Sequence, residues 1–213
     1  MKVIIVANVE QQQEIVSKNT NPQAELAFLK GFSELEAGDY DAVFYLPEDQ
    51  SGLDIEKVAG KPVFINSVIE TLEQNKWPLN VSRINGWPGF LQKKIWEVVS
   101  NDKAPAGKIF ERLQWNVVFV NDEPGLVSCR VISMIINEAF FALGEDVSSI
   151  DEIDLAMKLG TNYPYGPFEW KDKIGLQNIY HLLKNLSLKD KRYSVAPLLE
   201  KQYFEFTDSQ KIQ

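Results

Sequence analysis

The 213-residue sequence contains one cysteine, Cys129, and one histidine, His181. A single cysteine excludes an internal disulfide framework and is typical of proteins in a reducing compartment. One cysteine and one histidine cannot build a zinc site of the usual Cys/His kind within one chain. We therefore expect neither disulfides nor a metal site.

Long apolar runs and an excess of basic residues are also missing. No apolar run approaches the roughly 20 residues that a membrane-spanning helix needs. Met1-Lys2 leads directly into a short apolar run rather than into the ordered regions of a signal peptide. The formal net charge of -8 disfavours nucleic acid and anionic membrane surfaces as partners. These absences predict a cytoplasmic protein with no nucleic-acid and no membrane partner.

Glycine is missing from the first turn of the chain. Val3 to Val6 is an unbroken apolar run typical of a buried strand, and Gln11 to Val16 continues with a helical pattern. A strand, turn and helix that bind a dinucleotide normally carry G-x-G-x-x-G, because only bare backbone lets the pyrophosphate approach the helix N-terminus. Here the turn is Ala7-Asn8-Val9-Glu10 and the first glycine is Gly31, so we expect no pyrophosphate at this turn.

Up to about residue 122 the chain alternates short apolar runs with short helical patterns. This alternation predicts an α/β domain with a mostly parallel sheet. The predicted strands are Lys2–Ala7, Glu25–Leu29, Asp41–Leu46, Pro62–Ile65, Val81–Asn85, Trp96–Val99 and Asn116–Val120. The predicted helices are Glu10–Val16, Val68–Asn75 and Gly107–Leu113.

From Pro124 onward the pattern is helical. Leu126–Leu143 predicts a long helix that is apolar on two faces, one with Val127, Val131, Met134, Ile135 and Phe141 and the other with Ile132, Ile136 and Phe140. A helix that is apolar all round is buried from both sides, so the second face predicts a partner domain or subunit. Further predicted helices run from the capping box Ser149 to Glu152 as far as Gly160 as a C′ glycine, over Leu176–Leu186 and over Pro197–Tyr203.

Three segments of this second half carry a family resemblance. The stretches DEPGLVSCRVISMIINEAFFAL (122–143), SSIDEIDLAMKLGTNYPYGPFEWKDKIGL (148–176) and RYSVAPLLEK (192–201) resemble the C-terminal domain of 3-hydroxyacyl-CoA dehydrogenases. The residues at the family's spacing are Gly160, Pro164, Gly166, Pro167, Asp172 and Gly175. In the first half, residues 82–99 and 107–125 are similar to the same family's Rossmann domain. The resemblance implies a fold of class α/β plus all-α, with a truncated Rossmann-like, mostly parallel sheet domain over 1–122 and a helical dimerisation domain over 123–213.

The resemblance also implies where the family's functional residues fall. That family oxidises 3-hydroxyacyl-CoA with NAD, using a histidine base steered by a glutamate, with an asparagine and a serine that bind the substrate oxygen. These positions fall, in that order, on Asn85, Glu97, Cys129 and, loosely, Ser67. An asparagine amide can donate a hydrogen bond but cannot take a proton at neutral pH.

The family's phosphate turn falls on Ala7, Asn8, Val9 and Glu10, and Lys30 stands where an acidic residue would hold the ribose hydroxyls. A lysine there could meet a 2′-phosphate. Each candidate also has a structural interpretation: Glu97 as a solvated or paired carboxylate, Cys129 as a small core residue, and Asn85 and Trp87 as turn and packing residues. We expect His181 to be structural or exposed.

Three functions are open at this point. The first is a 3-hydroxyacyl-CoA dehydrogenase-like protein that has lost NAD binding and hydride transfer and is retained as a dimeric binding or assembly protein. The second is an active NAD-dependent 3-hydroxyacyl-CoA dehydrogenase of fatty-acid metabolism with an atypical site. The third is an acyl-CoA-directed enzyme of another reaction type that uses Glu97 as its base. The missing histidine and the glycine-free turn favour the first, so we expect no cofactor, a homodimer through the 124–205 helices and an acyl-CoA-type ligand.

Overall fold

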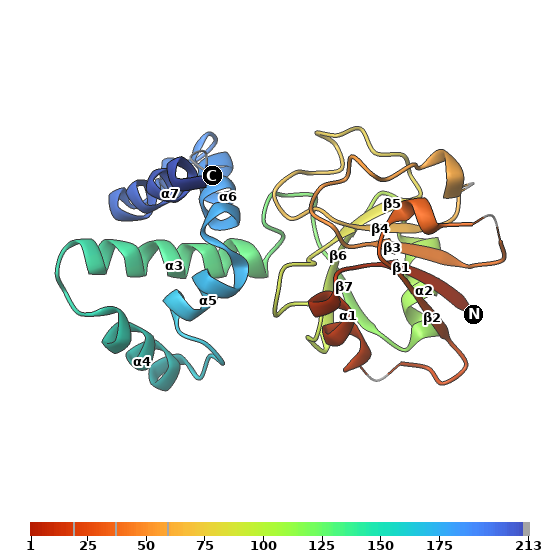
Figure 1. Cartoon of the computed structure of the whole chain (residues 1–213), viewed down its shortest axis with the longest axis horizontal. Coiled ribbons are helices and arrows are strands. Elements are labelled where there is room, and N and C mark those ends of the chain that lie inside the picture. Colours follow the sequence, from red (N-terminus) through yellow and green to blue (C-terminus); the bar gives the residue numbers. More distant parts are fainter. Residues whose placement is uncertain (19, 37, 59, 211–213) are drawn as a thin grey trace. The chain divides into compact units, whose positions relative to one another are not determined.

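The chain forms two compact units, Met1–Leu126 and Val127–Gln213 (Figure 1). The structure is a computed structural model that describes residues 1–18, 20–36, 38–58 and 60–210. The first unit ends after Leu126 rather than after Asp122. Hydrogen bonds tie residues 122–125 to the first unit, because Arg83 binds Asp122 and Glu123 and the Gly125 amide donates to the Val68 carbonyl at 2.7 Å.

The first unit contains a seven-stranded sheet with the order β2-β1-β3-β4-β5-β6-β7. All neighbouring strands are parallel except β5 and β6. The strands are β1 (Lys2–Val6), β2 (Glu25–Leu29), β3 (Ala42–Tyr45), β4 (Val63–Asn66), β5 (Val81–Ile84), β6 (Ile95–Ser100) and β7 (Asn116–Phe119). Each predicted strand is present with both ends within one residue, and the predicted Rossmann-like, mostly parallel class is confirmed.

One face of the sheet packs against α1 (Val9–Val16) and α2 (Lys103–Leu113). Ile15 of α1 and Phe110 of α2 enter a core that also contains Phe44 and Phe64, whose rings stack with centroids 4.5 Å apart. Burial of these large apolar side chains is the main driving force for closing the helices onto the sheet. Helix α2 begins at Lys103, earlier than the predicted Gly107.

The connections from β2 to β3, from β3 to β4 and from β4 to β5 have no α-helix in their described part, only the 3-10 turns η1 (Phe32–Glu34) and η2 (Glu56–Val58). The helix predicted over Val68–Asn75 is wrong, because these residues form bends and turns. Several of their backbone groups bind side chains instead of forming a helical ladder. The Leu72 and Glu73 amides donate to the Asp122 carboxylate at 3.2 and 3.1 Å.

The second unit is helical, as predicted. Its helices are α3 (Ser128–Gly144), α4 (Ile150–Thr161), α5 (Pro167–Ile174), α6 (Leu176–Ser187) and α7 (Pro197–Gln210), with the 3-10 turn η3 (Lys191–Tyr193) before α7. The capping box at Ser149 and Glu152 is confirmed. Gly160 is not the C′ glycine, because α4 continues to Thr161 and Asn162 takes the left-handed conformation with φ 55°.

Helix α5, which the sequence patterns did not predict, begins at a buried carboxylate of α4. Asp154 accepts hydrogen bonds from the Phe168 and Glu169 amides at 2.8 and 3.2 Å and so satisfies free N–H groups of the first turn. A Cβ atom at position 166 would lie 2.4 Å from the Asp154 carboxylate, so only glycine fits there. Gly166 and Pro167, in the segment with the most specific resemblance, therefore serve the packing of α4 against α5.

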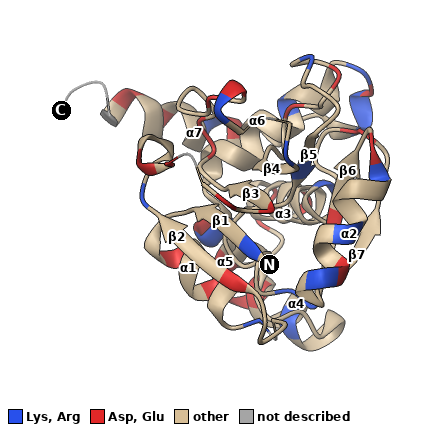
Figure 2. Cartoon of the chain, turned by 90° about the vertical axis from the view of Figure 1, so that its right-hand side faces the viewer, with Lys and Arg blue, Asp and Glu red and all other residues tan. Residues whose placement is uncertain are grey.

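Lys and Arg residues (blue) and Asp and Glu residues (red) are interspersed along the ribbon of the first unit (Figure 2). Within the described residues, no helix combines the length and the apolar content that a membrane crossing requires.

We expect Gly166→Ala and Gly160→Ala to change the free energy of unfolding in opposite directions. The first forces the new methyl group against Asp154 and should cost about 1 to 3 kcal/mol. The second meets no atom within 4 Å and should stabilise by roughly 0.5 to 1 kcal/mol through helix propensity. Urea unfolding followed by tryptophan fluorescence measures both. Equal effects of the two substitutions would contradict this account of the α4–α5 junction.

Candidate functional site

The carboxyl ends of β1, β3, β4 and β5 meet at one edge of the sheet, because these strands are parallel neighbours. The chain goes from β1 to β2 on one side and then to β3 on the other side of β1, so the winding direction reverses between β1 and β3. Ligands of open α/β sheets bind in the crevice outside the strand ends at such a reversal. The predicted residues Ala7, Asn8 and Asn85 follow the strands that end here.

The N-terminus of α1 lies at this edge and is closed by its own side chains. Asn8 Oδ1 accepts from the Gln11 amide at 2.9 Å, and Gln11 Oε1 accepts from the Asn8 amide at 3.1 Å, which is a complete capping box. Val9 is 71% exposed and Glu10 is also exposed. An anion that approached the helix end would meet an apolar side chain and a carboxylate.

The Gln11 side chain fills the crevice itself. Its Nε2 donates to the Leu46 carbonyl at 2.9 Å and to the Gly86 carbonyl at 3.4 Å. Asn66 completes the network, since its Nδ2 donates to the Leu46 carbonyl at 3.1 Å and its Oδ1 accepts from the Gly86 amide at 3.0 Å. Gln11 is 7% exposed and Asn66 is 2% exposed. The ends of β1, β3, β4 and β5 are thus joined by buried hydrogen bonds.

Lys30 follows β2 directly, as predicted, and its side chain is exposed. Its backbone amide donates to the Glu34 carboxylate at 3.1 Å. A dinucleotide site needs a carboxylate acceptor here for the ribose hydroxyls, and an ammonium group has no acceptor atom.

These residues do not fit the NAD that the fold family implies. The Gln11 amide, a donor that a pyrophosphate at the α1 N-terminus would use, is bonded to Asn8. The crevice at the winding reversal holds the buried Gln11 side chain, and the end of β2 carries a cation. Three separate requirements of dinucleotide binding are therefore unmet.

Asn85 and Glu97 are cross-strand neighbours. Strands β5 and β6 pair with Ile84 opposite Val98, and one further step in that register sets Asn85 opposite Glu97. Asn85 is 7% exposed and its Oδ1 accepts from the Trp87 amide at 3.2 Å, while Glu97 is half-buried. The two positions that the resemblance assigns to a base and its steering acid are adjacent, but an amide holds the place of the base.

The loop between β5 and β6 is held by a residue that sequence reasoning missed. The Glu14 carboxylate of α1 accepts from the amides of Gly89, Leu91 and Gln92 at 2.5, 3.0 and 3.3 Å. Two residues after the end of α1, Lys18 Nζ donates to the Lys93 carbonyl at 2.6 Å, and burial lowers the pKa of Lys18 to about 8. The Gln-rich, helical pattern of residues 11–16 contains no local signal for these long-range partners.

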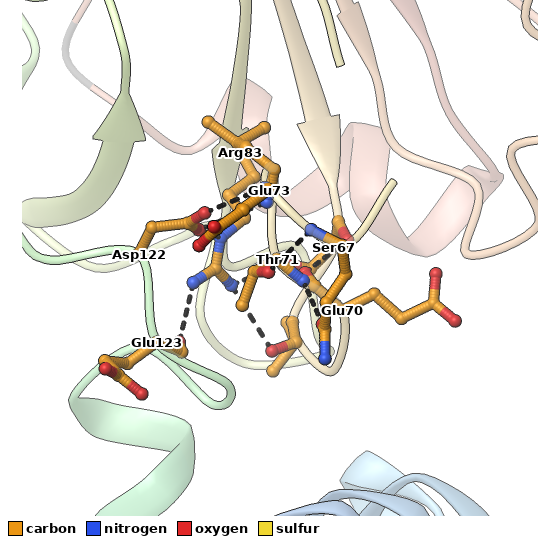
Figure 3. Close-up of polar contacts among 10 residues, drawn as sticks. Ser67, Glu70, Thr71, Glu73, Arg83, Asp122 and Glu123 are labelled. Carbon is orange, nitrogen blue, oxygen red and sulfur yellow. Dashed lines mark hydrogen bonds and ion pairs between the residues drawn. The ribbon is translucent and has the colours of Figure 1, made fainter. Parts of the chain in front are cut away.

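Ser67 belongs to a structural network around Arg83 (Figure 3). Its hydroxyl donates to the Glu70 carbonyl at 2.9 Å, and its carbonyl accepts from Arg83 Nη1 at 3.1 Å. The Arg83 side chain is 0% exposed, and its Nε donates to the Asp122 carboxylate at 2.6 Å while Nη2 donates to the Glu123 carbonyl at 2.6 Å. The Ser67 hydroxyl is thereby engaged within its own loop.

Cys129 and His181 lie in the second unit. Cys129 is in the first turn of α3 and is fully buried, consistent with its interpretation as a small core residue. His181 is exposed on α6, and its Nε2 lies 3.3 Å from the Tyr203 hydroxyl. The expectation that His181 is structural or exposed is confirmed.

A cavity elsewhere in the first unit is not lined by the predicted site residues. A cavity of about 260 Å³ lies over β1 and β2 and is lined by Lys2, Ile4, Leu29, Glu34 and Tyr40, among others. Lys30 and Glu97 are not among its lining residues. Within the described part of the chain, no cluster of three or more His, Cys, Asp or Glu residues could hold a metal ion.

Residues 125–211 match the family model described as the C-terminal domain of 3-hydroxyacyl-CoA dehydrogenase. The chain is 44% identical over 88 residues to the 3-hydroxyadipyl-CoA dehydrogenase of Escherichia coli K12, covering 40% of this chain and 18% of that protein. It is 31% identical over 149 residues to the 3-hydroxybutyryl-CoA dehydrogenase of Clostridioides difficile, covering 63% of this chain and 51% of that protein. The matched region thus spans about half or less of these relatives' length.

The fold is also similar to that of a solved structure. The crystal structure of FadB2 from M. tuberculosis has a TM-score of 0.66 with 18% identity, covering 84% of this chain and 70% of that one. At this level of identity the likeness concerns the fold of both units and carries no chemistry.

We expect Arg83→Leu to lower the free energy of unfolding by about 3 to 5 kcal/mol, because it leaves buried carbonyls and the Asp122 carboxylate without their donor. Arg112→Leu is the matched control. Its ion pair with Asp41 is at the surface, with side chains 51% and 32% exposed, so the cost should stay below about 1 kcal/mol. Urea unfolding of both variants measures the difference, and similar costs would contradict a structural role for the Arg83 network.

Proposed function

We propose that this chain, whose residues 125–211 match the C-terminal domain of 3-hydroxyacyl-CoA dehydrogenases, belongs to that family and has lost NAD binding and hydride transfer. The protein is then a dehydrogenase-like protein retained for binding or assembly, as a homodimer. An acyl-CoA-type ligand and a cytoplasmic location belong to the same proposal.

The observation that carries the proposal is the closed carboxyl edge of the sheet. Gln11 Nε2 donates to the Leu46 and Gly86 carbonyls, in the crevice where an open α/β sheet binds its ligand. A dinucleotide would have to break these bonds and leave buried polar groups without partners, which costs about 1 to 3 kcal/mol for each group. It would gain no glycine turn in exchange, since the turn is Ala7-Asn8-Val9-Glu10.

The chemistry of the site also supports the proposed loss of hydride transfer. Oxidation of a hydroxyl to a carbonyl requires a base that takes the hydroxyl proton, within hydrogen-bond reach and with a suitable pKa. Asn85 can orient a carbonyl or hydroxyl oxygen by donating a hydrogen bond, but it cannot take the proton. Its neighbour Glu97 keeps a carboxylate in place, so the pair is suited to binding a polar oxygen rather than to moving a proton.

The proposed homodimer is supported by apolar side chains that the second unit leaves exposed. Val127, just before α3, and Val131 on α3 are exposed, whereas Ile132, Ile136 and Phe140 on the other predicted face are buried. On α4, Leu155 and Leu159 are 55% and 78% exposed one turn apart. Apolar surface of this kind on neighbouring helices of one unit is typical of a self-complementary interface.

We expect no heat of binding when NADH is titrated into the purified protein up to millimolar concentration in a calorimeter. The reason is the buried Gln11–Asn66 network in the place of the cofactor. A micromolar affinity would contradict the proposal and would restore the alternative, an active NAD-dependent 3-hydroxyacyl-CoA dehydrogenase with an atypical site.

A variant serves as the control for the role of the base. Asn85→His replaces the amide by an imidazole beside Glu97, but it leaves the cofactor crevice closed. It should therefore show no NADH-dependent reduction of acetoacetyl-CoA. Turnover by this variant would mean that the crevice opens in solution.

We expect the protein to sediment at twice its chain mass of 24.3 kDa at micromolar concentration. Leu159→Asp, which adds a charge to the exposed apolar face of α4, should shift it to the monomer. Leu79→Asp is the matched control, since Leu79 is an exposed leucine of the first unit and should leave the mass unchanged. A monomeric parent protein would refute the dimer.

A further inference from the structure

One face of α1 is directed at the loop between β5 and β6. Gln11 and Glu14 are three residues apart, which places them on one side of the helix, and Lys18 follows two residues after its end. Each binds a different part of the loop: Gln11 the Gly86 carbonyl, Glu14 the amides of Gly89, Leu91 and Gln92, and Lys18 the Lys93 carbonyl. The contacts follow the order of the chain on both sides, so the helix and the loop run alongside one another.

The central contact is a carboxylate in a concave group of backbone donors. The amides of Gly89, Leu91 and Gln92 converge on the two Glu14 oxygens at 2.5 to 3.3 Å. Gly89 has φ 86°, a conformation that glycine adopts without strain, and it turns its amide toward the carboxylate. Successive N–H groups in a turn of this kind form an anion-binding nest.

The two ends of the contact are anchored in the core and in the crevice. Lys18 Nζ lies 4.9 Å from the ring centre of Trp96, and the Trp96 Nε1 donates to the Leu91 carbonyl at 2.9 Å. Gln11 lies in the buried network with Asn66. Between these anchors the loop carries Asn85 at its start and leads into the strand of Glu97.

We propose that residues 89–92 form an anion-binding nest whose resident ligand is the Glu14 carboxylate, and that Gln11 and Glu14 of α1, with Lys18 just after the helix, form a clamp that positions the loop from Asn85 to Lys94. Glu14 is a positioning residue, since it acts through the loop. This inference deepens the proposed function and rests on it in one respect: α1 binds the loop between β5 and β6 instead of a cofactor phosphate.

Hydrogen exchange of single amides tests the nest. Glu14→Gln keeps the shape of the side chain but replaces one acceptor oxygen with a donor group. The amides of Gly89, Leu91 and Gln92 should then exchange roughly 10-fold faster or more, because hydrogen bonds to a charged acceptor are lost. Glu10→Gln, on the exposed side of the same helix, should leave them unchanged. Unchanged exchange in Glu14→Gln would overturn the proposal.

Chemical rescue distinguishes an anion site from general weakening. In Glu14→Ala, acetate or formate at tens of millimolar should restore slow exchange at these three amides, and chloride at equal ionic strength should not. If the three amides lose protection together with all core amides and acetate restores none of it, residues 89–92 are not a nest and the proposal fails.

The result is independent of the NADH titration. Loss of protection in Glu14→Gln together with NADH binding by the parent protein would refute the proposed function and keep the nest. No NADH binding together with unchanged exchange would keep the proposed function and refute the nest.

Discussion

The buried guanidinium of Arg83 is the interaction on which the connection from β4 to β5 depends. This connection contains bends and turns, so its carbonyls and amides have no helix to bind them. Arg83 satisfies the Ser67 and Glu123 carbonyls and fixes Asp122, and Asp122 in turn accepts from the Leu72 and Glu73 amides. One side chain of β5 thereby joins the segment after β4 to the segment that leads into the second unit.

At the carboxyl edge of the sheet, too, side chains pair the buried backbone groups, in the place where a ligand would otherwise lie. Backbone groups at strand ends must be paired when they are buried, and a bound cofactor is one way to pair them. In this chain Gln11 and Asn66 pair the Leu46 and Gly86 groups, and Glu14 pairs the amides of Gly89, Leu91 and Gln92. The first helix of the fold, which in a dinucleotide site receives an anion, here supplies one.

The sequence was sufficient for elements whose signal is local. Apolar runs such as Val3 to Val6 predicted every strand to within one residue. It was insufficient where the deciding partner is distant in the chain. The predicted helix over Val68–Asn75 has an acceptable local pattern, but Asp122 and Arg83 take its backbone groups. Glu14 was overlooked for the same reason, since its partners are backbone amides about 75 residues away.

The part of the chain with the strongest resemblance turns out to specify packing. Gly166 stands where any Cβ would collide with Asp154, and Asp154 exists in that geometry because it binds the first amides of α5. Gly166 is therefore required by the packing of α4 against α5, and its presence is compatible with either an active or an inactive first unit. Chemistry has to be judged on the residues that would touch cofactor and substrate. There Lys30 and Asn85 stand at the positions that the resemblance assigns to the ribose-binding acid and to the base, which is why we propose that hydride transfer is lost.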